Sequence, residues 1–300
     1  MLAGKLCVVT GANCGIGRVI ATELAASGAH VVLACRSRER AEHVALDIRN
    51  RTRNERVEFR HLDLASLASV RSFADALLRE QAPVSVLVNN AGLMSTSWEL
   101  TADGYETTWQ VNALGPWLLT QLLLPSLTKA AADGTPGSAR VVNVGSRLEK
   151  TGNVDDLQRV PEATARFRGE ASSFNKYAAY GTSKLALSAL TFEQARRCRH
   201  THPGLVVTLC TPGIVNTELS RFAPGWLLAV SAPFRWLLLR TPKTGADTPI
   251  WLASSREEAA LASGQYFYNR APIQASERAN DEAIASALWD TCEAQVAIAS

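Results

Sequence analysis

The stretch Leu6-Cys7-Val8-Val9-Thr10-Gly11-Ala12-Asn13-Cys14-Gly15-Ile16-Gly17 lies near the start of the chain. Its first five residues are apolar and rich in β-branched side chains, which is typical of a strand buried on both faces. A helical pattern from Arg18 to Ser27 follows the glycines. A glycine turn between a strand and a helix lets the backbone approach a pyrophosphate, which the helix N-terminus attracts. We therefore predict a dinucleotide site at Gly11, Asn13, Cys14, Gly15, Ile16 and Gly17, with a connection of no chemical importance as the alternative.

Strand and helix patterns alternate along the rest of the chain, with helices expected at 39–50, 67–80, 104–132 and 175–200. This alternation predicts an α/β fold, a doubly wound Rossmann sheet of parallel strands with helices on both faces. We expect one domain over residues 1–300, because α/β folds of this length often form one. The further strands are predicted at His30–Cys35, Arg56–Leu62, Val84–Val88, Arg140–Val144 and, closing the series, Leu205–Cys210.

The end of the second strand bears on the choice of dinucleotide. A dinucleotide fold normally places an acidic side chain there, on the ribose 2′-hydroxyl. This chain has Arg36 and Ser37 instead, and its first carboxylate is Glu39. An arginine can pair a 2′-phosphate bidentately, which favours NADP(H) over NAD(H). NAD(H) stays open, since solvated arginines at a strand end are the alternative.

Polar and small residues follow the next two strands, at the edge where open α/β sheets bind ligands. Asp63 and Leu64 follow the third strand, and Asn90, Ala91 and Gly92 follow the fourth. Small residues there suit a backbone that lies against a flat ring, although they would equally suit a plain turn.

Two helices carry candidate catalytic residues. Asn112 lies in the predicted helix 104–132 just before Gly115-Pro116, a sequence that favours a kink and a freed backbone carbonyl. On the helix 175–200, Tyr180 and Lys184 stand four residues apart and so share one side. A nearby ammonium favours a phenolate, which predicts a lowered pKa for a phenol used in proton transfer. A Tyr and a Lys at this spacing are also common without any role, and Tyr177, two turns from Lys184, is expected to pack or to line a pocket.

Composition excludes several other classes of protein. Hydrophobic residues make up 47% of the chain and charged residues 20%, ordinary values for a protein with a sizeable core. The net charge is +3 with no long run of one sign, which argues against nucleic acid as a partner. The six cysteines are scattered, so we expect free thiols, no disulfide framework and no metal site.

Two stretches depart from the alternating pattern. Residues 147–176 form a long polar connection, interpreted as an insertion on the substrate side. Residues 222–239 are apolar but interrupted by prolines, too broken for a membrane span. They favour an apolar lid over residues 214–242, with a pair of packed helices as the alternative; a peripheral membrane contact through 222–240 stays open. The first strand begins almost at once, so we expect no signal peptide or membrane anchor and a cytoplasmic location.

Taken in order along the chain, the motifs resemble those of the short-chain dehydrogenase/reductase superfamily. The strings at 31–36, 62–71 and 224–227 resemble its retinol-dehydrogenase-like group. The resemblance covers nearly the whole chain and rests on Thr10-Gly11-x-x-x-Gly15-x-Gly17, Asp63, Asn89-Asn90-Ala91-Gly92, Asn112, Ser146, Tyr180-x-x-x-Lys184 and Pro212-Gly213.

The resemblance implies a role for each catalytic candidate. Tyr180 would be the general acid/base, and Ser146 would hydrogen-bond the substrate oxygen. Lys184 would lower the Tyr180 pKa and hold the nicotinamide ribose, and Asn112 would hold a water that links Lys184 to solvent.

The resemblance also implies cofactor contacts beyond the glycine turn. Asp63 would fix the adenine and Asn90 would lie along the adenosine ribose. The contacts with the nicotinamide would come from the turn after the sixth strand, at Pro212, Gly213, Val215 and Thr217.

The function expected from this resemblance is NADP(H)-dependent interconversion of an apolar alcohol and its aldehyde or ketone, such as a retinoid or lipid carbonyl. A steroid dehydrogenase and a catalytically silent NADP-binding interaction protein are the alternatives. A homodimer stays open, because many members of the superfamily pair through the helices that start near Gly104 and Asn175.

Overall fold

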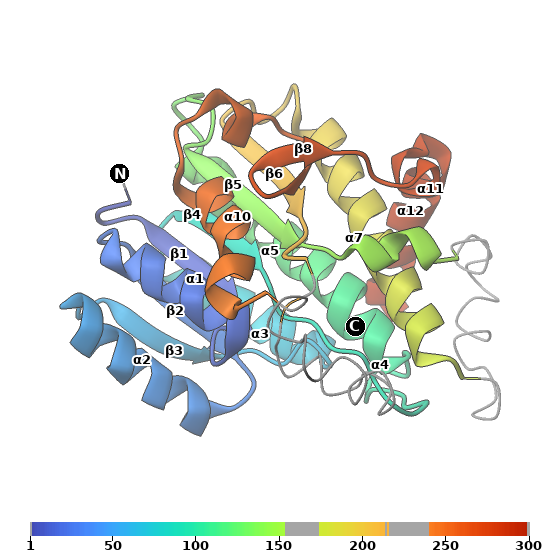
Figure 1. The fold of residues 1–300 in the computed structure, drawn as a ribbon, viewed down its shortest axis with the longest axis horizontal. Coiled ribbons are helices and arrows are strands. Elements are labelled where there is room, and N and C mark those ends of the chain that lie inside the picture. Colours follow the sequence, from blue (N-terminus) through green and yellow to red (C-terminus); the bar gives the residue numbers. More distant parts are fainter. Residues whose placement is uncertain (1, 154–173, 214, 216–239, 299–300) are drawn as a thin grey trace.

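A computed structural model describes residues 2–153, 174–213, 215 and 240–298. In it, eight strands form one sheet in the order β3-β2-β1-β4-β5-β6-β7-β8 (Figure 1). The first six are parallel, as predicted from the alternating pattern. Their bounds are β1 Leu6–Thr10, β2 His30–Cys35, β3 Val57–His61, β4 Val84–Asn89, β5 Ala139–Val144 and β6 Leu205–Cys210.

The prediction that β6 closes the sheet is wrong. Beyond it, β7 (Tyr266–Tyr268) pairs parallel with β6, and β8 (Ala271–Ile273) pairs antiparallel with β7. Both strands have three residues, too few for a periodic pattern to stand out in the sequence.

Alternate side chains of β1 enter two different hydrophobic cores. Leu6 and Val8 belong to one buried cluster, and Cys7 and Val9 belong to the other. Successive side chains of a strand point to opposite faces of the sheet, so a continuous apolar run is what a sheet covered on both faces requires.

Helices cover each face of the sheet (Figure 1). The core that holds Cys7 is closed by α1 (Gly15–Ala26), α2 (Arg38–Thr52) and α10 (Pro242–Ser254). The core that holds Leu6 is closed by α3 (Leu67–Arg79), α5 (Gly115–Ala130), α7 (Lys176–Cys198) and α12 (Glu282–Ile298).

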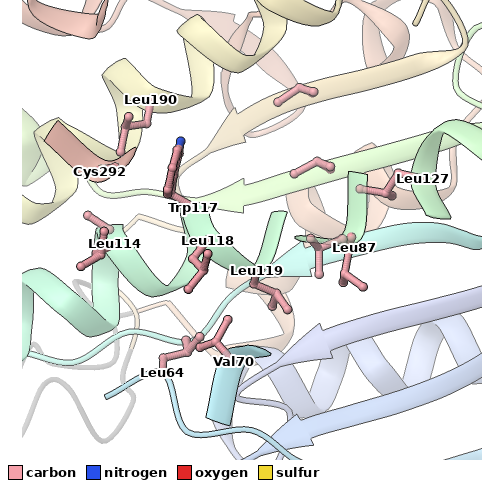
Figure 2. Packing of buried hydrophobic residues seen from close by; sticks show 14 of the residues in the cluster. Leu64, Val70, Leu87, Leu114, Trp117, Leu118, Leu119, Leu127, Leu190 and Cys292 are labelled. Carbon is pink, nitrogen blue, oxygen red and sulfur yellow. The ribbon is translucent and has the colours of Figure 1, made fainter. Parts of the chain in front are cut away.

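Helix α5 lies at the centre of the second core. Figure 2 shows Trp117 beside Leu190 of α7 and Cys292 of α12. Leu118 points the other way, toward Leu64 and Val70. One helix therefore joins the C-terminal part of the chain to the α3 region.

The single helix predicted over 104–132 is three elements. A short α4 (Thr107–Trp109) is followed by a π-helical stretch, η1 (Gln110–Leu114), and then by α5. The start at Gly104 is wrong, because Glu106 caps the first amides, at Thr108 and Trp109, and Leu100 pairs with Glu106 as an isolated bridge. The irregularity expected around Asn112 is present, as a π-helical stretch.

Candidate active site

Ser146, Tyr180 and Lys184 meet where β5 ends beside the start of α7. Ser146 is the N-cap of a short 3₁₀ helix, η2 (Arg147–Thr151), and its hydroxyl accepts a hydrogen bond from the Leu148 amide at 3.3 Å. Tyr180 is 7% exposed and is hydrogen-bonded by the Ser146 side chain. The Lys184 Nζ lies 5.8 Å from the centroid of the Tyr180 ring. The three side chains thus face one small volume, as four-residue helical spacing requires.

The pKa of Tyr180 shifts opposite to the expected direction in the chain by itself. Burial raises the pKa of this phenol to about 12, and the Ser146 hydrogen bond lowers it by less. A phenolate without water around it is costly, and here that cost outweighs the stabilisation by its neighbours. The expected lowering by Lys184 is therefore wrong for the chain alone.

Lys184 carries the complementary shift. Its side chain is 3% exposed, and Nζ donates to the Val144 carbonyl at 2.9 Å. Burial lowers the pKa of this ammonium to about 8, with a smaller opposite contribution from the Cys210 thiol. A lysine with a pKa of about 8 is still mostly a cation at pH 7, but it loses its charge about two pH units earlier than an exposed lysine does.

Asn112 ties the segment after β4 to α7. Its Oδ1 accepts from the Leu93 amide at 2.8 Å, and its Nδ2 donates to the Leu93 carbonyl at 2.7 Å and to the Ser183 hydroxyl at 3.0 Å. The Ser183 hydroxyl donates in turn to the Tyr180 carbonyl at 2.8 Å. The Asn112 side chain thus fixes backbone on both sides of the site.

The glycine turn lies against the residues that follow β4. The Asn90 amide and the Ala91 amide donate to the Thr10 hydroxyl at 3.0 and 2.9 Å, and the Asn90 side chain donates to the Thr10 carbonyl at 2.9 Å. A Cβ on Gly17 would lie 2.4 Å from Asn90 Nδ2 and 2.5 Å from the Gly11 carbonyl oxygen. The spacing of the glycines is therefore required by contact between two turns at the sheet edge.

This edge fits a dinucleotide. Gly11 and Gly15 have φ of 65° and 53°, which glycine adopts at little cost. The first turn of α1 holds Gly15, Ile16 and Gly17 rather than a carboxylate, which suits the approach of a pyrophosphate to a helix N-terminus. A Cβ on Gly92 would lie 3.3 Å from Lys184 Nζ, so the bare backbone leaves room beside the amine.

The other predicted cofactor residues line the same edge. Asn13 and Cys14 complete the glycine turn, half-buried and exposed respectively. Arg36 is exposed after β2, followed by Ser37 at the N-cap of α2. Asp63 follows β3, and its carboxylate accepts a hydrogen bond from the Ala65 amide at 2.9 Å. Leu64, between them, is buried against the core.

The turn after β6 is formed as expected around Pro212 and Gly213. Gly213 has φ of 76°, and the Pro212 carbonyl accepts from Arg240 at 3.1 Å. Val215 is 8% exposed and bridges to Arg240. Thr217, the apolar stretch 222–239, with most of the proposed lid, and most of the proposed 147–176 insertion lie outside the described residues.

Three contributors to this edge were given no role in the sequence analysis. Thr10 and Ser183 make the bonds described above, and Asn89 donates to Thr120 at 3.0 Å and to Asn143 at 2.8 Å within the buried core. Each of the three is next in sequence to a predicted site residue, and this position was the only sign in the sequence that it could contribute to the site. Apart from the bond from Ser183 to Tyr180, these bonds join residues 31 to 81 positions apart, which one sequence does not reveal.

Two features are absent from the described ranges. Within them, no cluster of His, Cys, Asp and Glu side chains suits a metal ion. No helix in those ranges combines the length and apolarity that crossing a membrane demands.

Comparison with known proteins places this geometry in a family. The model for short chain dehydrogenases matches residues 5–155. Dehydrogenase/reductase SDR family member 13 of Homo sapiens is 41% identical over 290 residues, 96% of this chain and 72% of that protein. Retinol dehydrogenase 13 of Homo sapiens is 39% identical over 96% of this chain and 83% of that protein. Among solved structures, the RhlG/NADP complex of Pseudomonas aeruginosa is 28% identical, covers 88% of this chain and 94% of that one, and has a TM-score of 0.66.

The chain therefore belongs to the short-chain dehydrogenase/reductase family. Within that family it falls in the retinol-dehydrogenase-like group. It is an oxidoreductase that acts on CH–OH and C=O groups, on a fold that binds a nicotinamide dinucleotide.

Proposed function

We propose that this enzyme interconverts an apolar alcohol and its aldehyde or ketone, of the retinoid or lipid-carbonyl class, with a preference for NADP(H). The observation that carries the proposal is the convergence of Ser146, Tyr180 and Lys184 beside the glycine turn. The bound nicotinamide ring would supply or accept the hydride.

The chain's own residues would handle the proton. For carbonyl reduction, Tyr180 must start protonated, and burial with a pKa of about 12 keeps it so at neutral pH. The Ser146 hydroxyl would hydrogen-bond the substrate oxygen as its charge changes. In alcohol oxidation the same phenol must release its proton first. The rate of oxidation would therefore depend on how far the protein lowers the pKa of Tyr180.

The cofactor preference rests on Arg36. This guanidinium is exposed one residue beyond β2, beside the glycine turn, and Ser37 follows it as the N-cap of α2. A planar guanidinium suits a phosphate bidentately. The complex of Pseudomonas aeruginosa RhlG with NADP supports the same preference.

The apolar substrate class rests on the side chains next to the catalytic residues. Leu148, two residues after Ser146, is 42% exposed, and Tyr177, one turn before Tyr180, is 39% exposed. Two residues before α7, Phe174 is half-buried and packs edge-on against the half-buried Trp98, with 5.9 Å between ring centroids. Exposed apolar groups beside polar catalytic groups suit a ligand that is apolar around one reactive oxygen. The name of retinol dehydrogenase 13 agrees with this class.

A substrate panel tests the proposal. Purified protein would be assayed with NADPH against retinal, a medium-chain aliphatic aldehyde, a ketosteroid and a hydrophilic sugar aldehyde. We expect turnover of retinal or the aliphatic aldehyde well above that of the sugar. A steroid preference would replace the proposed substrate class, and tight NADPH binding without any turnover would support the silent interaction protein instead.

Substitution of Arg36 tests the cofactor preference separately. The variant Arg36→Asp should lower the ratio of kcat/KM with NADPH to that with NADH by about 10- to 100-fold, the loss of one charge-assisted pair. Arg40→Asp makes the same charge change at an exposed position of α2 and should leave the ratio near wild type. An unchanged ratio in Arg36→Asp would count against Arg36 as the phosphate partner.

A further inference from the structure

Glu149 is a fully buried carboxylate three residues after Ser146, in η2. Among the described residues, one distant residue, Ser276, donates to both of its oxygens. Oε1 accepts from the Ser276 amide at 3.1 Å, and Oε2 accepts from the Ser276 hydroxyl at 2.5 Å. A buried carboxylate is costly without such partners, so this contact must persist for the fold to keep Glu149 inside.

Ser276 begins a turn in the C-terminal part of the chain. It is the N-cap of α11 (Glu277–Asn280), and its hydroxyl also accepts from the Ala279 amide at 3.3 Å. From the same turn, Arg278 donates to the Gly152 carbonyl at 3.1 Å. The C-terminal segment therefore holds η2 at its middle and at its end.

Helix α7 also contacts η2. A Cβ on Gly152 would lie 2.6 Å from the Gly181 carbonyl oxygen, and one on Gly181 would lie 2.6 Å from Thr151 Oγ1. Such distances mean that the two backbones touch with no room for a methyl group. η2 is thus fixed by α7 and by the α11 turn together, and Ser146, its N-cap, takes its place from η2.

We propose that Glu149 is a positioning residue: through Ser276 it fixes η2, and so holds the Ser146 hydroxyl against Tyr180. The proposal rests on the proposed function only for the roles of Ser146 and Tyr180. It assigns to the α11 turn, more than 90 residues beyond Tyr180, a part in setting the geometry of the proton-transfer site.

Hydrogen exchange of residues 147–152 tests the physical contact without any need for turnover. In Glu149→Ala the amides of η2 should exchange at least tenfold faster than in wild type. Glu149→Gln should keep slow exchange, because an amide can accept from the Ser276 N–H and donate to its hydroxyl. Ser276→Ala, which keeps the backbone bond, should be intermediate. Unchanged exchange in both Glu149→Ala and Ser276→Ala would overturn the proposal.

Alcohol oxidation as a function of pH tests the effect on Ser146. Loss of the Ser146 hydrogen bond should raise the apparent pKa of Tyr180, so the rising limb of kcat should move to higher pH, with kcat about tenfold lower or more near neutral pH. The cofactor KM should change less than about twofold, since the glycine turn is untouched. Lys184 faces Tyr180, and Cys210 lies near Lys184. Tyr266 lies near both Glu149 and Arg147, and the variants replace none of these other charged or titratable residues.

The controls separate a structural role from positioning. Glu80→Ala removes an exposed carboxylate that bonds Arg60 and should leave the pH profile unchanged. A Glu149 or Ser276 variant that loses thermal stability but keeps the wild-type kcat and the wild-type pH dependence of kcat would overturn the positioning role. If Glu149→Ala does not fold, the rising limb of kcat in Ser276→Ala must move to higher pH. A wild-type protein silent on every substrate would contradict the proposed function, and exchange would still decide whether Glu149 holds η2.

Discussion

At the scale of single residues, Lys184 shows a conflict between stability and function. Its amine is buried beside Tyr180, and burial lowers its pKa from 10.5 to about 8. A depressed pKa means that the folded chain favours the neutral amine, so the associated stability is present above pH 10.5 and is lost as the pH falls through 8. Near neutral pH this loss is on the order of 3 kcal/mol.

Lys184→Met should therefore make the cofactor-free protein more stable than wild type at pH 7 while abolishing most turnover. The gain in the free energy of unfolding should be about 1 to 3 kcal/mol, since the amine also loses its bond to Val144. It should shrink as the pH is raised toward 10. Urea unfolding at pH 7 and pH 10 measures both effects.

Lys243→Met, at an exposed position of α10, is the matched control and should change stability by less than about 0.5 kcal/mol at either pH. A Lys184→Met protein less stable than wild type at pH 7 would show that the ammonium is not penalised by burial.

At the scale of elements, the contact between η2 and α7 depends on Gly181. Alanine normally stabilises a helix interior relative to glycine by roughly 0.5–1 kcal/mol. Here a Cβ would lie 2.6 Å from Thr151 Oγ1 and 3.0 Å from the Leu148 carbonyl oxygen. The sign of the substitution should therefore be reversed.

Gly181→Ala should destabilise the protein by about 1–3 kcal/mol, the usual cost of overpacking. It should also reduce turnover, because η2 carries Ser146. Chemical denaturation gives the first result and the substrate assay the second. Thr151→Ala in the Gly181→Ala background removes the hydroxyl from the clash and should recover part of the stability. A stabilised Gly181→Ala would contradict the close contact.

Elements with a long periodic pattern were predictable from sequence, and those made by distant contacts were not. The strand Leu6–Thr10 and the Tyr180 helix lie close to their expected bounds, since burial on both faces and helical periodicity leave a clear pattern. The π-helical stretch at Gln110–Leu114 was predictable only as an irregularity around Asn112. Its form depends on the bonds from Asn112 to Leu93 and Ser183, far away in sequence.

At the scale of the whole molecule, the C-terminal helix α12 packs on α7 and α5 (Figure 1). Trp289 meets Trp117 edge-on with 5.3 Å between ring centroids, and the Arg197 guanidinium lies 4.3 Å from the Trp289 ring centroid. The indole N–H donates to Glu293 at 2.8 Å. The last described helix thus packs against both α7 and α5.

Trp289→Ala should lower the free energy of unfolding by about 3–5 kcal/mol, the range for removing a large buried aromatic side chain. Trp289→Phe should cost less, because it keeps the edge-to-face contact but loses the bond to Glu293. Leu46→Ala changes a side chain that is 51% exposed and should stay within about 0.5 kcal/mol. Thermal and urea unfolding of the three variants measure these differences. A cost below about 1 kcal/mol for Trp289→Ala would mean that α12 contributes little to the core.

The arrangement of the site followed from sequence more readily than its electrostatics. Helical spacing predicted that Tyr180 and Lys184 share a side, and the order of strand and glycine turn predicted the cofactor edge. The predicted direction of the Tyr180 pKa shift was wrong, because the shift depends on how fully the phenol is buried. Burial is set by the packing of the whole chain. The bond between Glu149 and Ser276 spans 127 positions and has no local pattern.

The central claim is that the buried Tyr180 phenol transfers the substrate proton. Its most direct test is the kcat of Tyr180→Phe against wild type, with NADPH and the best aldehyde of the panel, after cofactor affinity is shown to be retained. We predict a fall of about 10²-fold or more, the usual contribution of a positioned acid. Turnover equal to wild type, with NADPH bound equally well, would contradict it.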